Sequence, residues 1–277
     1  MPSRSPAPPM SIDDSRAAGL GGSAAKGPLA GRSLPDVDIV VLAGGLGTRV
    51  GSLLVDVPKI MAPVGGRPFL DYLLHWLIGQ GAARVVLCLG FRAGTVLAYL
   101  ETHSFPPLQV LTMVEPSPLG TAGALGFALP VLRSDPVIVM NGDTMLDADL
   151  SAFVASHRSA GTSASVLCAR VNDPQRYGRV RINSSDRIAR FEEKSNVSAE
   201  PCWANAGVYL FGRAALEQIA KLEHGSLERD VLEAMPPGSI HACRVPGSFL
   251  DIGTPESLAQ ASTLLEHGDL IPKDWKP

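Results

Sequence analysis

The fold of this chain is decided by the segment Asp38-Ile-Val-Val-Leu-Ala-Gly-Gly-Leu-Gly-Thr-Arg49, which is followed by Pro58-Lys59 and Gly65-Gly66-Arg67-Pro68. The apolar run 39–42 ends at two glycines, which predicts a buried parallel strand that leads into a glycine loop. Open α/β sheets bind ligands at that position. The loop glycines allow backbone N–H groups to turn toward an anion, and the arginine and lysine add positive charge. The expected ligand is a polyphosphate.

Two other kinds of glycine loop fit this segment poorly. A dinucleotide-binding fingerprint counted from Gly45 would need its third glycine at Val50, and the next predicted strand ends in Gly90-Phe91 without a ribose-binding acid. A Walker loop needs Gly-Lys-Ser/Thr, but Gly47 is followed by Thr48 and Arg49. For the glycines alone, an ordinary turn between a strand and a helix remains the alternative.

Length and composition indicate one α/β domain. The chain has 277 residues, of which 45% are hydrophobic and 18% charged, enough for a substantial core. The net charge is −3 and no basic cluster occurs, so nucleic acid is not an expected partner. No apolar run approaches the ~18 residues that span a bilayer, and the N-terminus lacks a hydrophobic signal core, so no membrane partner is expected.

The four cysteines point to a reducing compartment. They lie far apart in apolar surroundings, without Cys-x-x-Cys spacing, at Cys88, Cys168, Cys202 and Cys243. Reduced core thiols are therefore favoured over disulfides or zinc ligands. We expect a cytoplasmic protein, and a homo-oligomer is compatible with the sequence.

The order of the predicted elements indicates a parallel sheet. Residues 1–36 are rich in Pro, Ser, Gly and Ala, and are expected to be a disordered tail or a cloning extension ahead of a domain at 37–277. Alternating strands and helices then predict a Rossmann-like mixed, mainly parallel sheet flanked by helices. Predicted strands are 39–43, 84–90, 108–114, 136–141, 163–170 and 239–245, and predicted helices are 69–79, 94–101, 120–132, 148–158, 213–222, 226–235 and 255–266. Short extended pieces at 178–183, 187–191 and 203–211 predict a small antiparallel insertion over the open end of the sheet, at about 171–212.

Two carboxylates are candidates for a metal site. Asp143 ends the buried run Val137-Ile-Val-Met-Asn-Gly-Asp143, and Asp251 lies between apolar neighbours just before a predicted helix. Buried charge is costly unless it is paired or bound to metal. At the mouth of one sheet, the two aspartates would hold Mg²⁺ and leave positions for phosphate oxygens. The alternative for Asp143 alone is a cap of the following turn.

Polar residues of the insertion suit a sugar phosphate. Glu193 can accept hydrogen bonds from sugar hydroxyls, Lys194 can hold a phosphate, and Asn205 offers a donor and an acceptor. Tyr177-Gly178 would let the backbone approach a sugar ring. The alternatives are a solvated surface run for Glu-Glu-Lys194 and a plain turn for Tyr177-Gly178.

In their order along the chain, these motifs strongly resemble the sugar-1-phosphate nucleotidyltransferase family. The resemblance covers 38 to about 266, through the glycine loop to Arg49, Pro58-Lys59, Glu115 with Pro118-Leu-Gly-Thr-Ala-Gly123, Asn141-Gly-Asp143, Glu193-Lys194, Asn205-Ala-Gly207 and Asp251-Ile-Gly-Thr-Pro255. It implies a GT-A-like nucleotidyltransferase fold and the reaction of a nucleoside triphosphate with a sugar 1-phosphate, giving a nucleotide-sugar and pyrophosphate. The products implied are precursors for capsule or lipopolysaccharide.

Within the family, the chain looks most like the D-glycero-α-D-manno-heptose 1-phosphate guanylyltransferases, and mannose-1-phosphate guanylyltransferases are similar. Ile60 stands where relatives usually carry proline, and Ser117 where they often carry an acid. The implied substrates are GTP, or another nucleoside triphosphate, and a sugar 1-phosphate, with Mg²⁺ as cofactor. The implied catalytic residues are Arg49, Lys59, Asp143 and Asp251, and Asp143 and Asp251 are also the implied metal ligands. The implied nucleotide-binding residues are Leu42, Ala43, Gly44, Gly45, Gly47, Thr48, Glu115, Gly120 and Thr121. The implied sugar-phosphate-binding residues are Asn141, Tyr177, Gly178, Glu193, Lys194 and Asn205.

Glu115 favours guanine as the base. A carboxylate accepts from both donors on the Watson–Crick edge of guanine, whereas the mixed edge of uracil suits glutamine better. Three other functions stay open. A uridylyltransferase is the nearest. A glycosyltransferase would use an Asp-x-Asp motif such as Asp147-Ala-Asp149, which we assign instead to the start of a helix. A nucleotide-sugar sensor would have lost a metal ligand or Lys59.

Overall fold

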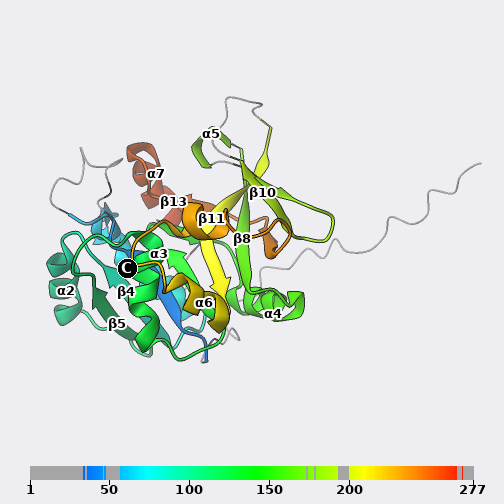
Figure 1. The fold of residues 1–277 in the computed structure, drawn as a ribbon. Coiled ribbons are helices and arrows are strands. Elements are labelled where there is room, and N and C mark those ends of the chain that lie inside the picture. Colours follow the sequence, from blue (N-terminus) through cyan, green and yellow to red (C-terminus); the bar gives the residue numbers. More distant parts are fainter. Residues whose placement is uncertain are drawn as a thin grey trace, which may run out of the picture.

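The computed structural model describes residues 34, 36–45, 47, 57–172, 174–177, 179–192, 200–266 and 270. Their main element is a seven-stranded sheet in the order β12-β8-β11-β6-β1-β4-β5 (Figure 1). All neighbouring pairs are parallel except those of β11, which is antiparallel to both β6 and β8. The strands are β1 (Ile39–Ala43), β4 (Arg84–Leu89), β5 (Gln109–Val114), β6 (Val137–Asn141), β8 (Ala164–Val171), β11 (Cys202–Phe211) and β12 (Ile240–Val245).

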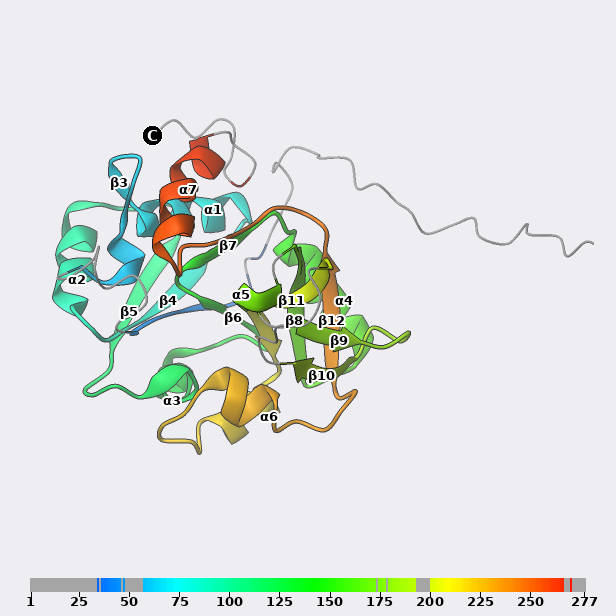
Figure 2. The same cartoon turned by 90° about the horizontal axis from the view of Figure 1, so that it is seen from above.

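Helices cover both faces of this sheet. Figure 2 shows α1 and α7 on one side and α3 and α6 on the other. The helices are α1 (Phe69–Gly79), α2 (Ala93–Thr102), α3 (Gly120–Ala128), α4 (Leu150–Ala160), α5 (Pro174–Tyr177), α6 (Arg213–Ile219) and α7 (Pro255–Glu266), with 3₁₀ turns at Lys59–Met61 and Leu129–Val131 and a π-helical turn at Leu227–Leu232. Across the described part of the chain, we find no helix with the length and apolarity that crossing a membrane requires.

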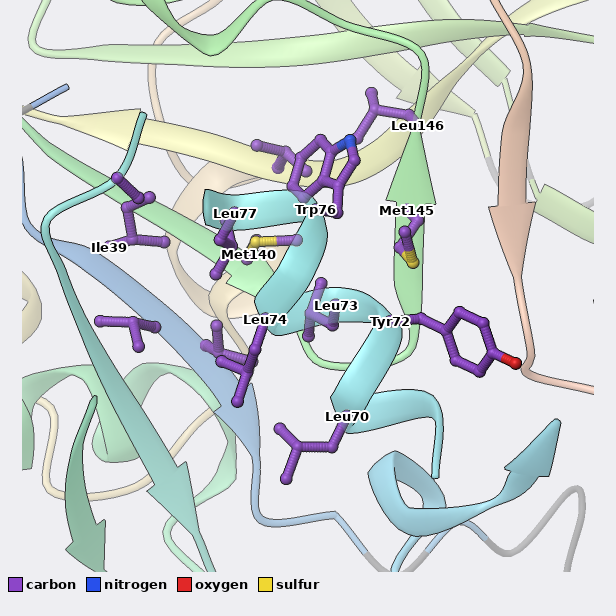
Figure 3. Close-up of a cluster of buried hydrophobic side chains, with 14 of the residues drawn as sticks. Ile39, Leu70, Tyr72, Leu73, Leu74, Trp76, Leu77, Met140, Met145 and Leu146 are labelled. Atoms are coloured by element: carbon purple, nitrogen blue, oxygen red, sulfur yellow. The ribbon is translucent and has the colours of Figure 1, made fainter. Parts of the chain in front are cut away.

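Alternate residues of β1 serve two hydrophobic cores. Ile39 and Val41 lie in the cluster under α1, whereas Val40 lies in the cluster under α3. Because both faces are covered, the strand is apolar at every position, as expected for a buried parallel strand. On the α1 side, Leu73 and Leu77 are fully buried and lie among the side chains of Figure 3. Each such leucine stabilises the fold by about 1.5–3 kcal/mol.

Three short two-stranded sheets complete the architecture. They pair β2 (Pro63–Val64) with β3 (Arg67–Pro68), β7 (Thr144–Leu146) with β13 (Phe249–Asp251), and β9 (Arg179–Ile182) with β10 (Ile188–Glu192). Of these six strands, β9 and β10 were predicted from the sequence and the other four were not. The β7–β13 pair joins segments that are more than 100 residues apart and directs Asp251 toward Thr144.

The predicted mainly parallel sheet with flanking helices is confirmed, with three local corrections. The strand predicted at 203–211 belongs to the main sheet and not to a separate insertion, because both of its edges pair with central strands. The helix predicted at 120–132 ends at Ala128 and gives way to a 3₁₀ turn at Leu129–Val131, because Pro130 has no N–H to donate to the carbonyl four residues before it. The helix predicted at 226–235 is a π-helical turn at Leu227–Leu232.

Packing of the domain begins earlier than the predicted boundary at residue 37. Leu34 is 3% exposed, and its backbone N–H donates to Gly81 O at 3.0 Å. It also forms a parallel bridge with Ala82. Leu34 is therefore part of the folded unit, although composition assigned it to the tail. Residues 1–33 lie outside the described part of the chain.

Candidate active site

The glycine loop begins where β1 ends. Leu42 and Ala43 close the strand, and Gly44, Gly45 and Gly47 follow it. Gly47 has φ +61°, a conformation that favours glycine, and a Cβ placed on it would lie 3.5 Å from Lys59 Cβ. Gly47 therefore lies beside Lys59, which suits a site for a polyphosphate. Thr48 and Arg49 lie outside the described residues.

Glu115 lies against the backbone of two neighbouring strand ends. A Cβ on Gly44 would lie 2.5 Å from Glu115 Oε1, and a Cβ on Gly90 would meet the same oxygen even more closely. The other carboxylate oxygen accepts from the backbone N–H of Leu119 at 3.1 Å. Only glycine at these two positions leaves room for this carboxylate at the carboxyl edge of the sheet. Its role in base recognition stays a prediction, because the bond to Leu119 is also what a turn cap would make.

Lys59, Asp143 and Asp251 meet at the mouth of the sheet. Lys59 Nζ lies 2.6 Å from Asp143 Oδ2. The backbone N–H of Ile252 donates to Asp143 O at 3.0 Å, which joins the segment after β13 to the end of β6. Thr144 Oγ1 donates to the other oxygen of Asp143 at 3.2 Å. The two predicted metal ligands and the predicted lysine are thus brought together by elements distant in sequence.

Burial and its neighbour make Asp251 an unusual acid. Burial raises the pKa of the Asp251 carboxyl, and the negative charge of Asp143 raises it further. Lys59, the backbone N–H of Gly253 and the guanidinium of Arg176 act in the opposite direction without cancelling the rise. A pair of carboxylates that repel each other in this way is a site that favours an added cation.

Asp143 and Asp251 are the carboxylates that the described residues bring together for that cation. No group of three or more His, Cys, Asp and Glu side chains in the described part of the chain could enclose a metal. A pair of oxygen ligands suits Mg²⁺, which keeps several waters and is often completed by substrate phosphates. The donor set therefore fits a metal that arrives with, or is held by, a polyphosphate.

Arg176 is a cation of the site that the sequence analysis missed. Its Nη2 donates to Asp251 O at 2.9 Å, and its guanidinium lies 4.8 Å from the ring centroid of Tyr177. The Tyr177 ring packs edge-on against Phe249 at 5.2 Å. Only Tyr177-Gly178 of this run was predicted as part of the site, and the arginine just before Tyr177 is the signal in the sequence that could have found it. Gly178 lies outside the described residues.

Asn141 and Asn205 both lie beside Gly207, at a break in the pairing of β11 with β8. Gly207 has φ +70°, and a Cβ on it would lie 2.7 Å from Asn141 Nδ2. The β11–β8 register shifts between Asn205 and Tyr209, which lets Asn205 Oδ1 accept from the backbone N–H of Gly207 at 2.9 Å. The two asparagines are thus brought to the same edge as Asp143. Glu193 and Lys194 lie outside the described residues.

Gly120 and Thr121 open α3 and pack against another segment of the chain. The backbone N–H of Ala122 donates to Gly225 O at 3.0 Å, and a Cβ on Gly120, at φ +71°, would clash with that carbonyl. Thr121 Oγ1 accepts from the backbone N–H of Leu227 at 2.7 Å. The N-terminus of α3 is therefore fixed by the turn at 225–228. A contact of either residue with nucleotide stays a prediction.

A shallow groove elsewhere is separate from these residues. Its volume is about 450 Å³, and it lies between the end of α2 and β5. Its lining is mostly apolar, including Leu97, Phe105 and Val110. None of the candidate site residues lines it.

Comparison with known proteins establishes the family. A family model described as nucleotidyl transferase matches residues 38–268, which include the glycine loop and both aspartates. The chain belongs to the nucleotidyl transferase family. The predicted membership is thus confirmed, and nucleotidyl transfer is the enzyme class of this protein.

The names of relatives of this nucleotidyl transferase give sugar 1-phosphates as their substrates. The chain is 34% identical over 237 residues to mannose-1-phosphate guanylyltransferase of Mycobacterium tuberculosis, a match that covers 84% of this chain and 65% of the relative. It is 32% identical to D-glycero-alpha-D-manno-heptose 1-phosphate guanylyltransferase of Campylobacter jejuni, covering 78% of this chain and 95% of the relative. The chain therefore spans about two thirds of the mycobacterial relative and nearly all of the Campylobacter one.

Solved structures agree with the fold. HddC from Yersinia pseudotuberculosis is 31% identical, with a TM-score of 0.75 over 83% of this chain and 99% of HddC. A second structure of that protein is complexed with GMP-PN.

Proposed function

We propose that this protein transfers the guanylyl group of GTP to D-glycero-α-D-manno-heptose 1-phosphate, giving GDP-heptose and pyrophosphate. The observation that carries the proposal is the meeting of Lys59, Asp143 and Asp251 beside the glycine loop. The alternative with specific support is transfer to mannose 1-phosphate, the substrate named for the mycobacterial relative.

The chemistry follows from charge. A sugar-phosphate oxygen attacks the α-phosphorus of GTP in line with the departing pyrophosphate, so two anions have to be brought together. Lys59 and Arg49 offset the charge of the triphosphate, Lys194 holds the incoming phosphate, and Arg176 adds positive charge beside Asp251. No general base is needed, because the attacking phosphate oxygen is already ionised.

Asp143 and Asp251 are the residues that would hold Mg²⁺. The ion would supply Lewis-acid stabilisation of charge on the phosphates. The protein's own contribution is the orientation of the two carboxylates. Asp143 is fixed by Thr144 Oγ1 and Lys59 Nζ, and Asp251 accepts from the backbone N–H of Gly253. Each carboxylate therefore keeps a defined direction.

Glu115 supports guanine as the base. Its carboxylate lies at Gly44, where the glycine loop leaves the sheet. It can accept from guanine N1–H and N2–H₂, at the expense of its bond to Leu119. The guanylyltransferase names of the relatives and the complex of HddC with GMP-PN favour the same nucleotide.

The extent of the matches supports heptose over mannose. The chain matches 95% of the Campylobacter heptose enzyme and 99% of HddC, but 65% of the mycobacterial mannose enzyme. Its four cysteines are free thiols, which fits the reducing cytoplasm, where we place the reaction. The product would then serve capsule or lipopolysaccharide synthesis.

Pyrophosphate release measured over a matrix of nucleotides and sugars tests the proposal. GTP, UTP, ATP and CTP are each combined with heptose, mannose and glucose 1-phosphates, with and without Mg²⁺. The expected maximum is GTP with the heptose 1-phosphate. A maximum with mannose 1-phosphate selects the alternative. Absence of release from every pair, with tight binding of GDP-heptose, would indicate a sensor instead of an enzyme.

A further inference from the structure

Glu228 has no role in the reaction proposed above, and its carboxylate contacts three hydroxyl groups. Its Oε1 accepts from Tyr209 Oη at 3.0 Å. Its Oε2 accepts from Thr121 Oγ1 at 3.3 Å and from Ser226 Oγ at 3.0 Å. Three donors from α3, β11 and the turn at 225–228 therefore converge on one carboxylate.

Tyr209 extends this network into the sheet. Its side chain is fully buried, and its hydroxyl accepts from Asn205 Nδ2 at 3.0 Å while donating to Glu228. Burial raises the pKa of Tyr209 well above its usual value, and the charge of Glu228 raises it further, so the hydroxyl keeps its proton. The hydrogen bonds thus run in one direction, from Asn205 through Tyr209 to Glu228.

This direction fixes the amide of Asn205. Nδ2 is directed at Tyr209, and Oδ1 accepts from the backbone N–H of Gly207. An amide with both ends engaged cannot exchange its oxygen and nitrogen without losing two hydrogen bonds. Its remaining Nδ2 hydrogen therefore has a set direction at the edge of the sheet that also carries Asn141.

We propose that Glu228 and Tyr209 are positioning residues. Together they fix the position of Thr121, on the nucleotide side of the site, relative to Asn205, on the sugar-phosphate side. The proposal rests on the proposed function, because the assignment of Thr121 to the nucleotide and of Asn205 to the sugar phosphate comes from that function. Glu228 contacts Thr121 directly and reaches Asn205 through Tyr209, so one carboxylate links both sides. Neither positioning residue is expected to touch the reacting phosphates.

The two positioning residues should give different kinetic signatures. Tyr209→Phe removes one oxygen and frees Asn205, but leaves the bond between Thr121 and Glu228. We expect its KM for the sugar phosphate to rise about tenfold, the usual effect of losing one buried hydrogen bond, with less than a twofold change for GTP. Glu228→Ala removes the acceptor oxygens of both Tyr209 and Thr121, so both KM values should rise.

Tyr72→Phe is the matched control. Tyr72 is also buried, and its hydroxyl donates to Val64 O at 3.1 Å in the α1 core shown in Figure 3, away from this network. It should lower the melting temperature without a change in either KM. The side-chain amide signals of Asn205 are followed by NMR in all variants, and should shift in Tyr209→Phe but not in Tyr72→Phe.

Each outcome decides the proposal. A selective rise of the sugar-phosphate KM together with a shifted Asn205 amide supports it. If Tyr209→Phe resembles Tyr72→Phe, with lower stability but unchanged KM values, the network is structural only and the proposal fails. If the wild-type protein releases no pyrophosphate from any pair, the proposed function has failed. The NMR signal of the Asn205 side-chain amide then tests the positioning network by itself. An unchanged signal in Tyr209→Phe overturns the proposal.

Discussion

Lys59 and Asp143 are 84 residues apart in sequence, yet Lys59 Nζ lies 2.6 Å from Asp143 Oδ2 at the carboxyl edge of the sheet. The pair is partly exposed, with 19% and 26% of the two side chains accessible, so its net contribution to stability is expected to be small. The pair places a cation beside the carboxylate that we propose as a metal ligand. Phosphoryl transfer requires both at the same phosphate.

Removing the charge of Asp251 should separate activity from stability. Asp251→Asn loses a metal ligand, so turnover with Mg²⁺ should fall by orders of magnitude. The same change removes a buried charge that repels Asp143, so the melting temperature without metal should rise. Calorimetry in EDTA and pyrophosphate release measure the two effects. Glu217→Gln, on the exposed face of α6, is the control and should change neither turnover nor the melting temperature. Full activity of folded Asp251→Asn would show that Asp251 is not a metal ligand.

Arg49 and Lys194 should act on different substrates. Arg49 belongs to the glycine loop and Lys194 to the segment between β10 and β11, and both lie outside the described residues. Lys194→Ala should raise mainly the KM for the sugar phosphate, and Arg49→Ala should damage mainly the use of GTP. Steady-state kinetics with each substrate varied in turn measures both. An identical effect of the two variants on the GTP KM alone would contradict separate pockets.

Glu115→Gln should weaken the preference for GTP. Losing a charge-assisted pair to guanine costs roughly 1.5 to 3 kcal/mol, or on the order of ten- to a hundredfold in selectivity. The measurement is the ratio of kcat/KM for GTP and UTP. Glu101→Gln, an exposed residue of α2, should leave that ratio as it is. A ratio unchanged in Glu115→Gln would leave Glu115 with the turn-capping role that its bond to Leu119 already shows.

Asp38 should make the fold sensitive to acid. Burial acts to raise the pKa of Asp38, but hydrogen bonds from the backbone N–H groups of Arg133 and Ser134 and from the guanidinium of Arg84 lower it overall. A lowered folded-state pKa means that the stabilisation is complete above the unfolded pKa, about 3.9, and is lost as the pH falls through the folded value.

Asp38→Asn measures that stabilisation. It leaves Arg84 buried without its carboxylate, so the free energy of unfolding at pH 7 should fall by about 3 kcal/mol. Urea denaturation at pH 7 and pH 3 should show a smaller difference in the free energy of unfolding between the variant and the wild type at the lower pH than at the higher. Equal differences at both values would show that the charge of Asp38 contributes nothing.

Much of the fold could be predicted because its strands are buried on both faces. Continuous apolar runs such as Ile39–Ala43 carry that signal locally, and α1 was predicted with the bounds Phe69–Gly79. The β7–β13 pair could not be predicted, since three-residue strands have no measurable periodicity and their pairing is long-range. Leu34 was missed because one apolar residue does not alter the composition of a polar segment.

The candidate site also contains residues that the local sequence reveals and residues that depend on long-range packing. Asp143 and Asp251 were predicted because a carboxylate within an apolar run is unusual in any sequence. Glu228 was missed because Leu-Glu-Arg-Asp resembles a solvated helical turn. Its role depends on Thr121 and Tyr209, which reach it only after α3 and β11 have packed together.

The reversed direction of β11 has a consequence for how such a site can diversify. Parallel strands offer only their last residues to the edge where β1 and β6 end, whereas a reversed strand offers its first. The first residues of β11 and the last residues of β6 therefore lie at one edge, reached from opposite directions. Under the proposed function, the acceptor contacts lie on β11 and the donor contacts follow β1, so donor and acceptor preferences can evolve on separate stretches of sequence.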